Sequence, residues 1–118
     1  PMPEPHPLKN HLQAWAKAYG GDQFARLGYA ADDRLTGAAA VSGDAEADRI
    51  EHIVQRLERV GRWKEARVLR AEFFLPDLPE NDRLQRLRRI GLTISRAGYY
   101  IYLNAACAYV EGALGEQP

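Results

Sequence analysis

The stretch ENDRLQRLRRIGLTISRAGYYIYLNAACAYVEGAL, residues 80–114, indicates the fold most clearly. Leucines recur at helical spacing over about residues 81–90, and a longer amphipathic helix follows over residues 95–114, with the turn GLTI between them. Gly91 permits the positive φ of a tight turn, and the Ser95 hydroxyl is suited to cap the second helix. The pattern predicts a C-terminal helix-turn-helix.

The longer of these two helices separates into two faces when successive residues are set 100° apart. The face predicted to point into the core holds Tyr99, Tyr102, Leu103, Ala106, Tyr109, Val110 and Ala113. The opposite face holds Arg96, Ala97, Tyr100, Ile101, Asn104 and Ala108. In a helix that enters a DNA groove, the N-terminal members of the outward face meet base edges. We therefore expect Arg96 to contact guanine, Asn104 to contact adenine, and Tyr100 to contact a phosphate or a thymine methyl group.

The helix before the turn is rich in arginine. Arg86 and Arg89 are predicted to point outward, with Arg83 and Arg88 on their flanks, where they would neutralise phosphates. Ser95 would touch a phosphate in addition to capping its helix. The complete set predicted to bind DNA is Arg86, Arg89, Thr93, Ser95, Arg96, Tyr100 and Asn104.

Three further helices are predicted before this motif. Apolar residues at spacings of 4, 3 and 4 predict a helix over residues 8–19. Asp44 is suited to cap a second helix, which Gly61 would close. The run WKEARVLRAEFF, residues 63–74, predicts a third, whose aromatic side chains are expected in the core and which Pro76 forbids from continuing.

The region between the first two of these helices, residues 20–43, is rich in glycine and is predicted to be mostly loop. Such a loop either wraps the core through Phe24, Leu27 and Tyr29 or forms a mobile functional segment. No segment has the alternating pattern of a strand, so the predicted class is all-α. The predicted organisation is one domain over residues 1–118, divided into a tail (1–7), a helical support region (8–75) and the helix-turn-helix (79–114).

Composition excludes several classes of protein. The 118 residues are 46% hydrophobic and 27% charged, as in ordinary globular domains. The single cysteine, Cys107, excludes an internal disulfide and a cysteine-rich zinc site. No apolar stretch is long enough for a membrane span, and the start PMPEPHP lacks the core of a signal peptide, so we expect a cytoplasmic protein without a membrane partner. Net charge is zero, but residues 62–96 carry nine Lys or Arg against five Asp or Glu.

Side chains suited to catalysis or to metal binding are scattered. The histidines His6, His11 and His52 form no ligand pair of a recognised spacing. The pair Asp32-Asp33 fits a turn or a helix cap, and Cys107 between alanines fits a small apolar filler. We therefore expect no enzyme, no metal site and no cofactor.

The segment ISRAGYYIYLNAACAYVEGAL resembles the recognition half of the sigma region 4-like helix-turn-helix in the bacteriophage antitermination protein Q family of late-gene regulators. A Ser-Arg pair opens the helix, and a Tyr-Tyr pair and an alanine-rich amphipathic tail follow. The upstream order LQAWAKAYGG, LGYAADDR and AEADRIEHIVQRL is also similar to that family, so the resemblance covers roughly residues 8–114. Relatives usually carry further basic residues at the positions of Ile101 and Asn104.

The resemblance implies a late-gene antiterminator in a bacterial host cell. Such a protein binds double-stranded promoter DNA and loads onto a paused bacterial RNA polymerase, with the sigma factor as a further candidate partner. Exposed Ile101 motivates an alternative, a small phage protein that binds a host protein, either RNA polymerase or a defence complex, without reading DNA. A dimeric repressor is a third reading. The DNA site, the oligomeric state, the surface that contacts polymerase and the role of residues 20–43 stay open.

Overall fold

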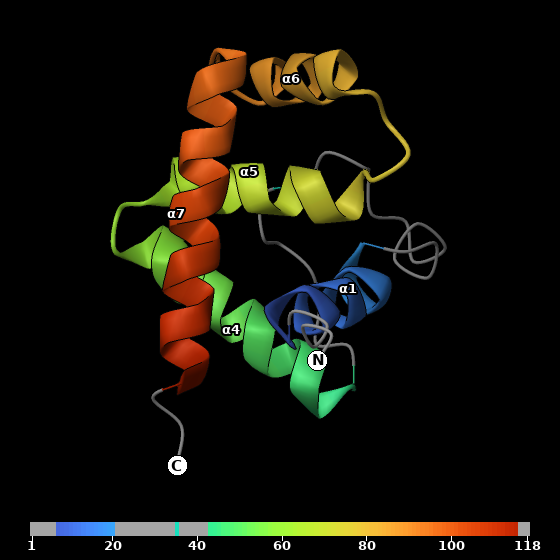
Figure 1. Ribbon diagram of the computed structural model, residues 1–118, viewed down its shortest axis with the longest axis vertical. Helices are drawn as coiled ribbons and strands as arrows, with labels where there is room; N and C mark the ends of the chain where they lie inside the picture. Colours follow the sequence, from blue (N-terminus) through green and yellow to red (C-terminus); the bar gives the residue numbers. More distant parts are fainter. Residues whose placement is uncertain (1–6, 21–34, 36–42, 116–118) are drawn as a thin grey trace, which may run out of the picture.

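The computed structural model describes residues 7–20, 35 and 43–115, and the elements in these ranges are all helices (Figure 1). The helices are α1 (Pro7–Tyr19), α4 (Ala45–Arg59), α5 (Trp63–Phe74), α6 (Glu80–Arg89) and α7 (Arg96–Gly115). The predicted all-α class is confirmed, and the helix ends differ from the predicted ones by at most one residue, as expected of fraying termini. None of the helices in the described ranges combines the length and the apolar character needed to cross a membrane.

Some predictions lie outside the described residues. These are the tail before Pro7 and the predicted loop apart from Gly20, Leu35 and Gly43, and with them His6, Phe24, Leu27, Tyr29, Asp32 and Asp33. Leu35 is fully buried and belongs to the core.

Local signals in the sequence set the ends of α4. The Asp44 carboxylate accepts hydrogen bonds from the backbone N–H groups of Glu46 and Ala47, at 3.0 and 3.1 Å. Gly61 has a φ of 93°, a conformation that glycine adopts without a Cβ clash. Both predicted boundary signals of this helix are therefore confirmed.

Helix α5 lies at the centre of the fold and contacts each of the other four described helices. The fully buried apolar side chains come from all five helices and include Trp15, Ile50, Leu57, Leu69, Leu87, Tyr99 and Val110. The rings of Trp15 and Phe74 lie 4.5 Å apart, which fixes α1 against α5. In α5 the prediction of core aromatics holds for Phe74, whereas Trp63 and Phe73 are half-buried.

A buried arginine is the unexpected feature of the core. Arg70 on α5 has no exposed surface, and its Nη1 and Nη2 atoms donate to the two oxygens of Glu51 at 2.8 and 2.9 Å. Glu51 also accepts from the indole N–H of Trp15 at 3.0 Å, and Glu58 accepts from Arg70 at 3.0 Å. Burial alone lowers the pKa of Arg70, but the hydrogen bonds and charges of Glu51 and Glu58 outweigh it and raise that pKa above its ordinary value.

The link between α6 and α7 contains the predicted turn residues. Gly91 has a φ of 96°, and the Ser95 hydroxyl oxygen accepts from the backbone N–H of Gly98 at 3.0 Å, so both local predictions are confirmed. Leu92 is buried in the core. Figure 1 shows α6 beside the start of α7 at one end of the molecule, with α1 and α4 at the other. Helix α7 packs most extensively on α5, and the designation of α6 and α7 as a helix-turn-helix stays a prediction.

Candidate nucleic-acid interface on α7

The two faces of α7 separate as the 100° rule predicts. Tyr99, Ala106, Val110 and Ala113 are buried, and Tyr102, Leu103 and Tyr109 are partly buried against the core. All six residues of the outward face, Arg96, Ala97, Tyr100, Ile101, Asn104 and Ala108, are exposed. The exposed fraction is 41% for Tyr100 and 66% for Ile101, so two large side chains with apolar surface stand in solvent.

Arg96 opens this face and is held by a neighbour. Its Nε atom donates to Glu80 on α6 at 2.8 Å, while 70% of the arginine side chain stays exposed. Exposed ion pairs of this kind contribute about 0–1 kcal/mol. The pair directs the guanidinium toward α6, and its weakness means that Arg96 can leave Glu80 at little cost.

The other predicted residues near the start of α7 are also accessible. Thr93 and Ser95 are exposed, and the Ser95 oxygen is occupied by the helix cap, which leaves its O–H as the group able to donate to a phosphate. The Tyr100 ring packs edge-on against the ring of Tyr99, with centroids 5.3 Å apart. This contact orients Tyr100 from the buried side.

The arginines of α6 divide into two groups. Arg88 and Arg89 are exposed, and Arg86, predicted to point outward, is half-buried. All three lie in the last turn of the helix, where positive charge also stabilises the helix dipole. Their position therefore has a structural reason in addition to any phosphate contact.

The position of Arg83 contradicts the prediction from the sequence, which placed this side chain on the flank of its helix, facing phosphates. Its Nε donates to the Tyr99 hydroxyl at 3.2 Å, and its Nη2 lies 3.6 Å from a Glu72 oxygen. Only 12% of the Arg83 side chain is exposed. It points inward because α5 and α7 present a carboxylate and a buried phenol on that side of α6.

The Tyr99 hydroxyl donates to Glu72 at 2.7 Å, and burial, followed by this carboxylate, raises the pKa of Tyr99 well above its ordinary value. The folded state therefore keeps a proton that the unfolded chain releases near pH 10. We expect stability to fall as the pH rises above about 10, by up to about 1.4 kcal/mol per pH unit. Urea unfolding at a series of pH values measures this loss.

The matched pair of variants for this prediction is Tyr99→Phe and Tyr100→Phe. Removing the buried phenol should flatten the alkaline loss of stability, and removing the exposed one should leave it unchanged. Equal slopes for wild type and Tyr99→Phe above pH 10 would contradict the assignment.

The predicted set omits a second group of exposed cations, on α4. Arg49, Arg56 and Arg59 stand at helical spacing along one side of that helix. The helical spacing of these arginines can be read from the sequence. Acidic residues lie between them along the chain, however, so the composition of the segment does not predict a basic face.

Side chains suited to catalysis stay dispersed. In the described ranges no three of His, Cys, Asp and Glu gather as a metal site would require. Burial raises the pKa of Cys107, which holds it as a thiol packed at the edge of the core.

Comparison of the chain with protein-family models, with curated proteins and with solved structures gives no match.

Proposed function

We propose that the protein binds double-stranded DNA with the first half of α7 in the major groove. The observation that carries the proposal is the exposure of Arg96, Tyr100 and Asn104, one helical turn apart on the outward face of α7. These three residues span about 12 Å along the helix, enough to meet three or four base pairs. Arginine and asparagine are the side chains that make paired hydrogen bonds to guanine and adenine edges.

Charge at the same end of the molecule supports the proposal. Residues 80–100 carry five arginines against the two acids Glu80 and Asp82. The exposed Arg88 and Arg89 precede the turn that leads into α7, so phosphates flanking the groove would meet positive charge. Together with the resemblance to the antitermination protein Q family, this favours a late-gene antiterminator that binds promoter DNA and loads onto paused RNA polymerase in the bacterial cytoplasm.

Selection of binding sites from a random duplex library should enrich one sequence. The Arg96→Ala variant should then bind that sequence about 5- to 150-fold more weakly and discriminate less at one base pair, because a paired contact contributes about 1–3 kcal/mol. Arg89→Gln should keep the sequence preference and lower the slope of log affinity against log salt by about 0.9. Fluorescence anisotropy across a salt series measures both effects.

Lys17→Gln is the control, because it removes one exposed charge from α1, which lies at the other end of the molecule from α6 and the start of α7 (Figure 1). A transcription assay on a template carrying the enriched site and a terminator then tests the regulatory role, with read-through expected. If no sequence is enriched while RNA polymerase is retained from nuclease-treated lysate, and Ile101→Asp abolishes that retention, the α7 face binds protein and the DNA proposal fails.

A further inference from the structure

The sequence of α4 is nearly neutral, but its acids and its bases lie in different environments. The helix has four acids, Glu46, Asp48, Glu51 and Glu58, and three arginines, Arg49, Arg56 and Arg59. Glu51 is 1% exposed and, with Glu58, is bound to the buried Arg70. Two of the four carboxylates are therefore directed toward Arg70, whose single positive charge offsets one of their two negative charges.

The other two acids of α4 are bound to α1. Glu46 pairs with the imidazole of His11, and the Asp48 carboxylate accepts from the Tyr19 hydroxyl at 2.5 Å. Every acid on α4 thus has a partner on another helix. On the outward side of α4 three arginines, Arg49, Arg56 and Arg59, lie beside one carboxylate of the same helix, Asp48, so positive charge is in excess there.

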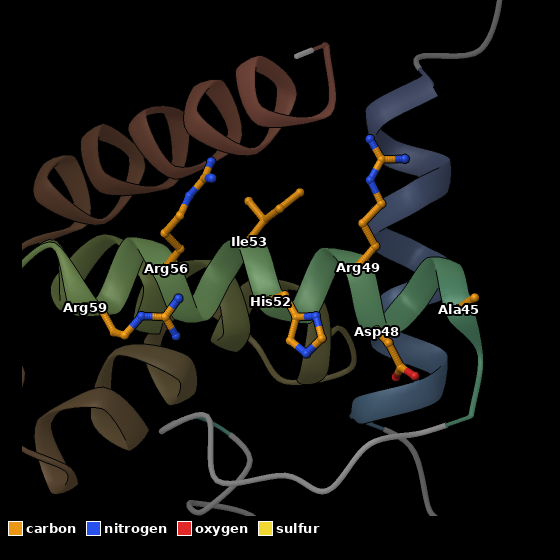
Figure 2. A pocket seen from close by; sticks show the side chains of 7 residues that line it. All are labelled: Ala45, Asp48, Arg49, His52, Ile53, Arg56 and Arg59. Carbon is orange, nitrogen blue, oxygen red and sulfur yellow. The ribbon is translucent and has the colours of Figure 1, made fainter. Parts of the chain in front are cut away.

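Three arginines and a histidine form a stripe, which we name the α4 stripe: Arg49, His52, Arg56 and Arg59. All four are exposed, and their spacings of 3, 4 and 3 residues set them along one side of the helix over about 15 Å. They line a shallow hollow of about 400 Å³ with Ala45, Asp48 and Ile53. Figure 2 shows Arg49 and Arg56 reaching to one edge of α4, and His52 and Arg59 to the other.

Contacts with α7 orient two members of the stripe. Arg49 donates to the carbonyl oxygen of Leu114 at 3.2 Å, and Arg56 donates to the Tyr109 hydroxyl at 2.8 Å. Side chains held in this way lose less conformational entropy when they bind a ligand. The side chains of His52 and Arg59 make no hydrogen bond or ion pair with any other described residue.

The shape of the stripe favours a chain of phosphates over a single small anion. Its side chains point to both edges of α4 and do not converge on one point. A length of about 15 Å corresponds to about four phosphates along one strand of a duplex. Guanidinium groups match phosphate oxygens in paired hydrogen bonds.

A membrane surface fits this face less well. Helices that lie on membranes present large apolar side chains beside their cations. On the stripe the large apolar residue is Ile53, which is only 8% exposed. Among the described residues the exposed large hydrophobics are Val60, Tyr100 and Ile101, and none of them lies within α4.

We infer that the α4 stripe binds the phosphodiester backbone of a nucleic acid without reading its bases. Figure 1 shows α4 at the opposite end of the molecule from α6 and the start of α7, so the stripe is a second contact surface. It goes beyond the proposed function and does not require α7 to read DNA. A duplex DNA and a single-stranded RNA offer the same phosphate chemistry to it.

The test is the salt dependence of binding to a random-sequence DNA duplex and to a single-stranded RNA of equal length, measured by fluorescence anisotropy. Arg59→Gln should lower the salt slope by about 0.9 on the duplex or about 0.7 on the single strand, and Arg49→Gln/Arg59→Gln by twice as much. Lys17→Gln, with the same loss of charge on α1, should leave the slope unchanged. The probe on which the variants show these reductions in salt slope is the kind of nucleic acid that the α4 stripe binds.

Folding does not confound this test, since the Arg59 side chain has no partner among the described residues and its charge in the last turn of α4 contributes only about 0.3–1 kcal/mol through the helix dipole. An unchanged salt slope for Arg59→Gln on both probes overturns the inference. So does tighter binding to phosphatidylserine vesicles than to either nucleic acid at the same salt. Loss of sequence preference in Arg96→Ala is a separate result, and it concerns only the proposal for α7.

Discussion

Replacing Arg70 with methionine should lower the free energy of unfolding by about 3–5 kcal/mol. The substitution leaves the Glu51 carboxylate in the core without its counter-ion, with the Trp15 indole N–H and the Gln55 amide as its remaining donors. A buried charge that loses its partner costs far more than the pair contributed. Urea unfolding followed by circular dichroism measures the loss as a lower midpoint at unchanged slope.

The double variant Arg70→Met/Glu51→Leu separates charge from packing. It should recover part of the lost stability, because two apolar side chains can replace a buried ion pair at little cost, although the buried Trp15 indole N–H loses its acceptor. Arg67→Met is the matched control on the same helix. Arg67 is half-buried and donates to the carbonyl oxygen of Ile90, so its loss should cost only about 1 kcal/mol. Equal losses in Arg70→Met and in the double variant would show that packing, not the stranded carboxylate, explains the effect.

Replacing Trp15 with alanine should also cost about 3–5 kcal/mol. The side chain is fully buried, packs on Phe74 with ring centroids 4.5 Å apart, and lies under the Arg70 guanidinium at 5.7 Å. Its removal opens a cavity between α1 and α5 and takes a hydrogen bond from Glu51. The same urea titration measures the change.

Trp15→Phe keeps a ring against Phe74 and removes the indole N–H. Its expected cost is about 1.5–3 kcal/mol, since the lost hydrogen bond is made to a charged group. Trp63→Ala provides the control, because Trp63 is only half-buried at the edge of the core, with the Arg67 guanidinium 4.5 Å from the centre of its ring. The proposed role of Trp15 is wrong if Trp63→Ala proves as costly as Trp15→Ala.

The positions and the ends of the helices were predicted from local patterns in the sequence. Apolar spacing located every described helix, and the caps at Asp44 and Ser95 and the positive φ at Gly61 and Gly91 were all predicted. These signals act over four residues or fewer, so they operate without the rest of the fold. The division of α7 into a buried and an exposed face followed in the same way, from its period of 3.6 residues.

Local sequence patterns did not predict the inward position of Arg83 or the burial of Arg70. In the sequence each is one arginine among many, and its spacing is compatible with either side of its helix. The deciding partners, Glu72 and Tyr99 for Arg83 and Glu51 for Arg70, lie 11 to 19 residues away along the chain. A charged side chain turns inward only where such a partner offsets the loss of its hydration.

Periodicity and capping chemistry thus account for which segments are helical and which side of α7 meets solvent. The charge that the surface presents depends on packing between helices. Helix α4 has four acids and three arginines, so its composition predicts no basic face. Its outward side has more arginines than acids because Arg70 on α5 and three side chains of α1 bind and orient those acids, a result of contacts between residues 12 to 36 positions apart, which no local pattern encodes.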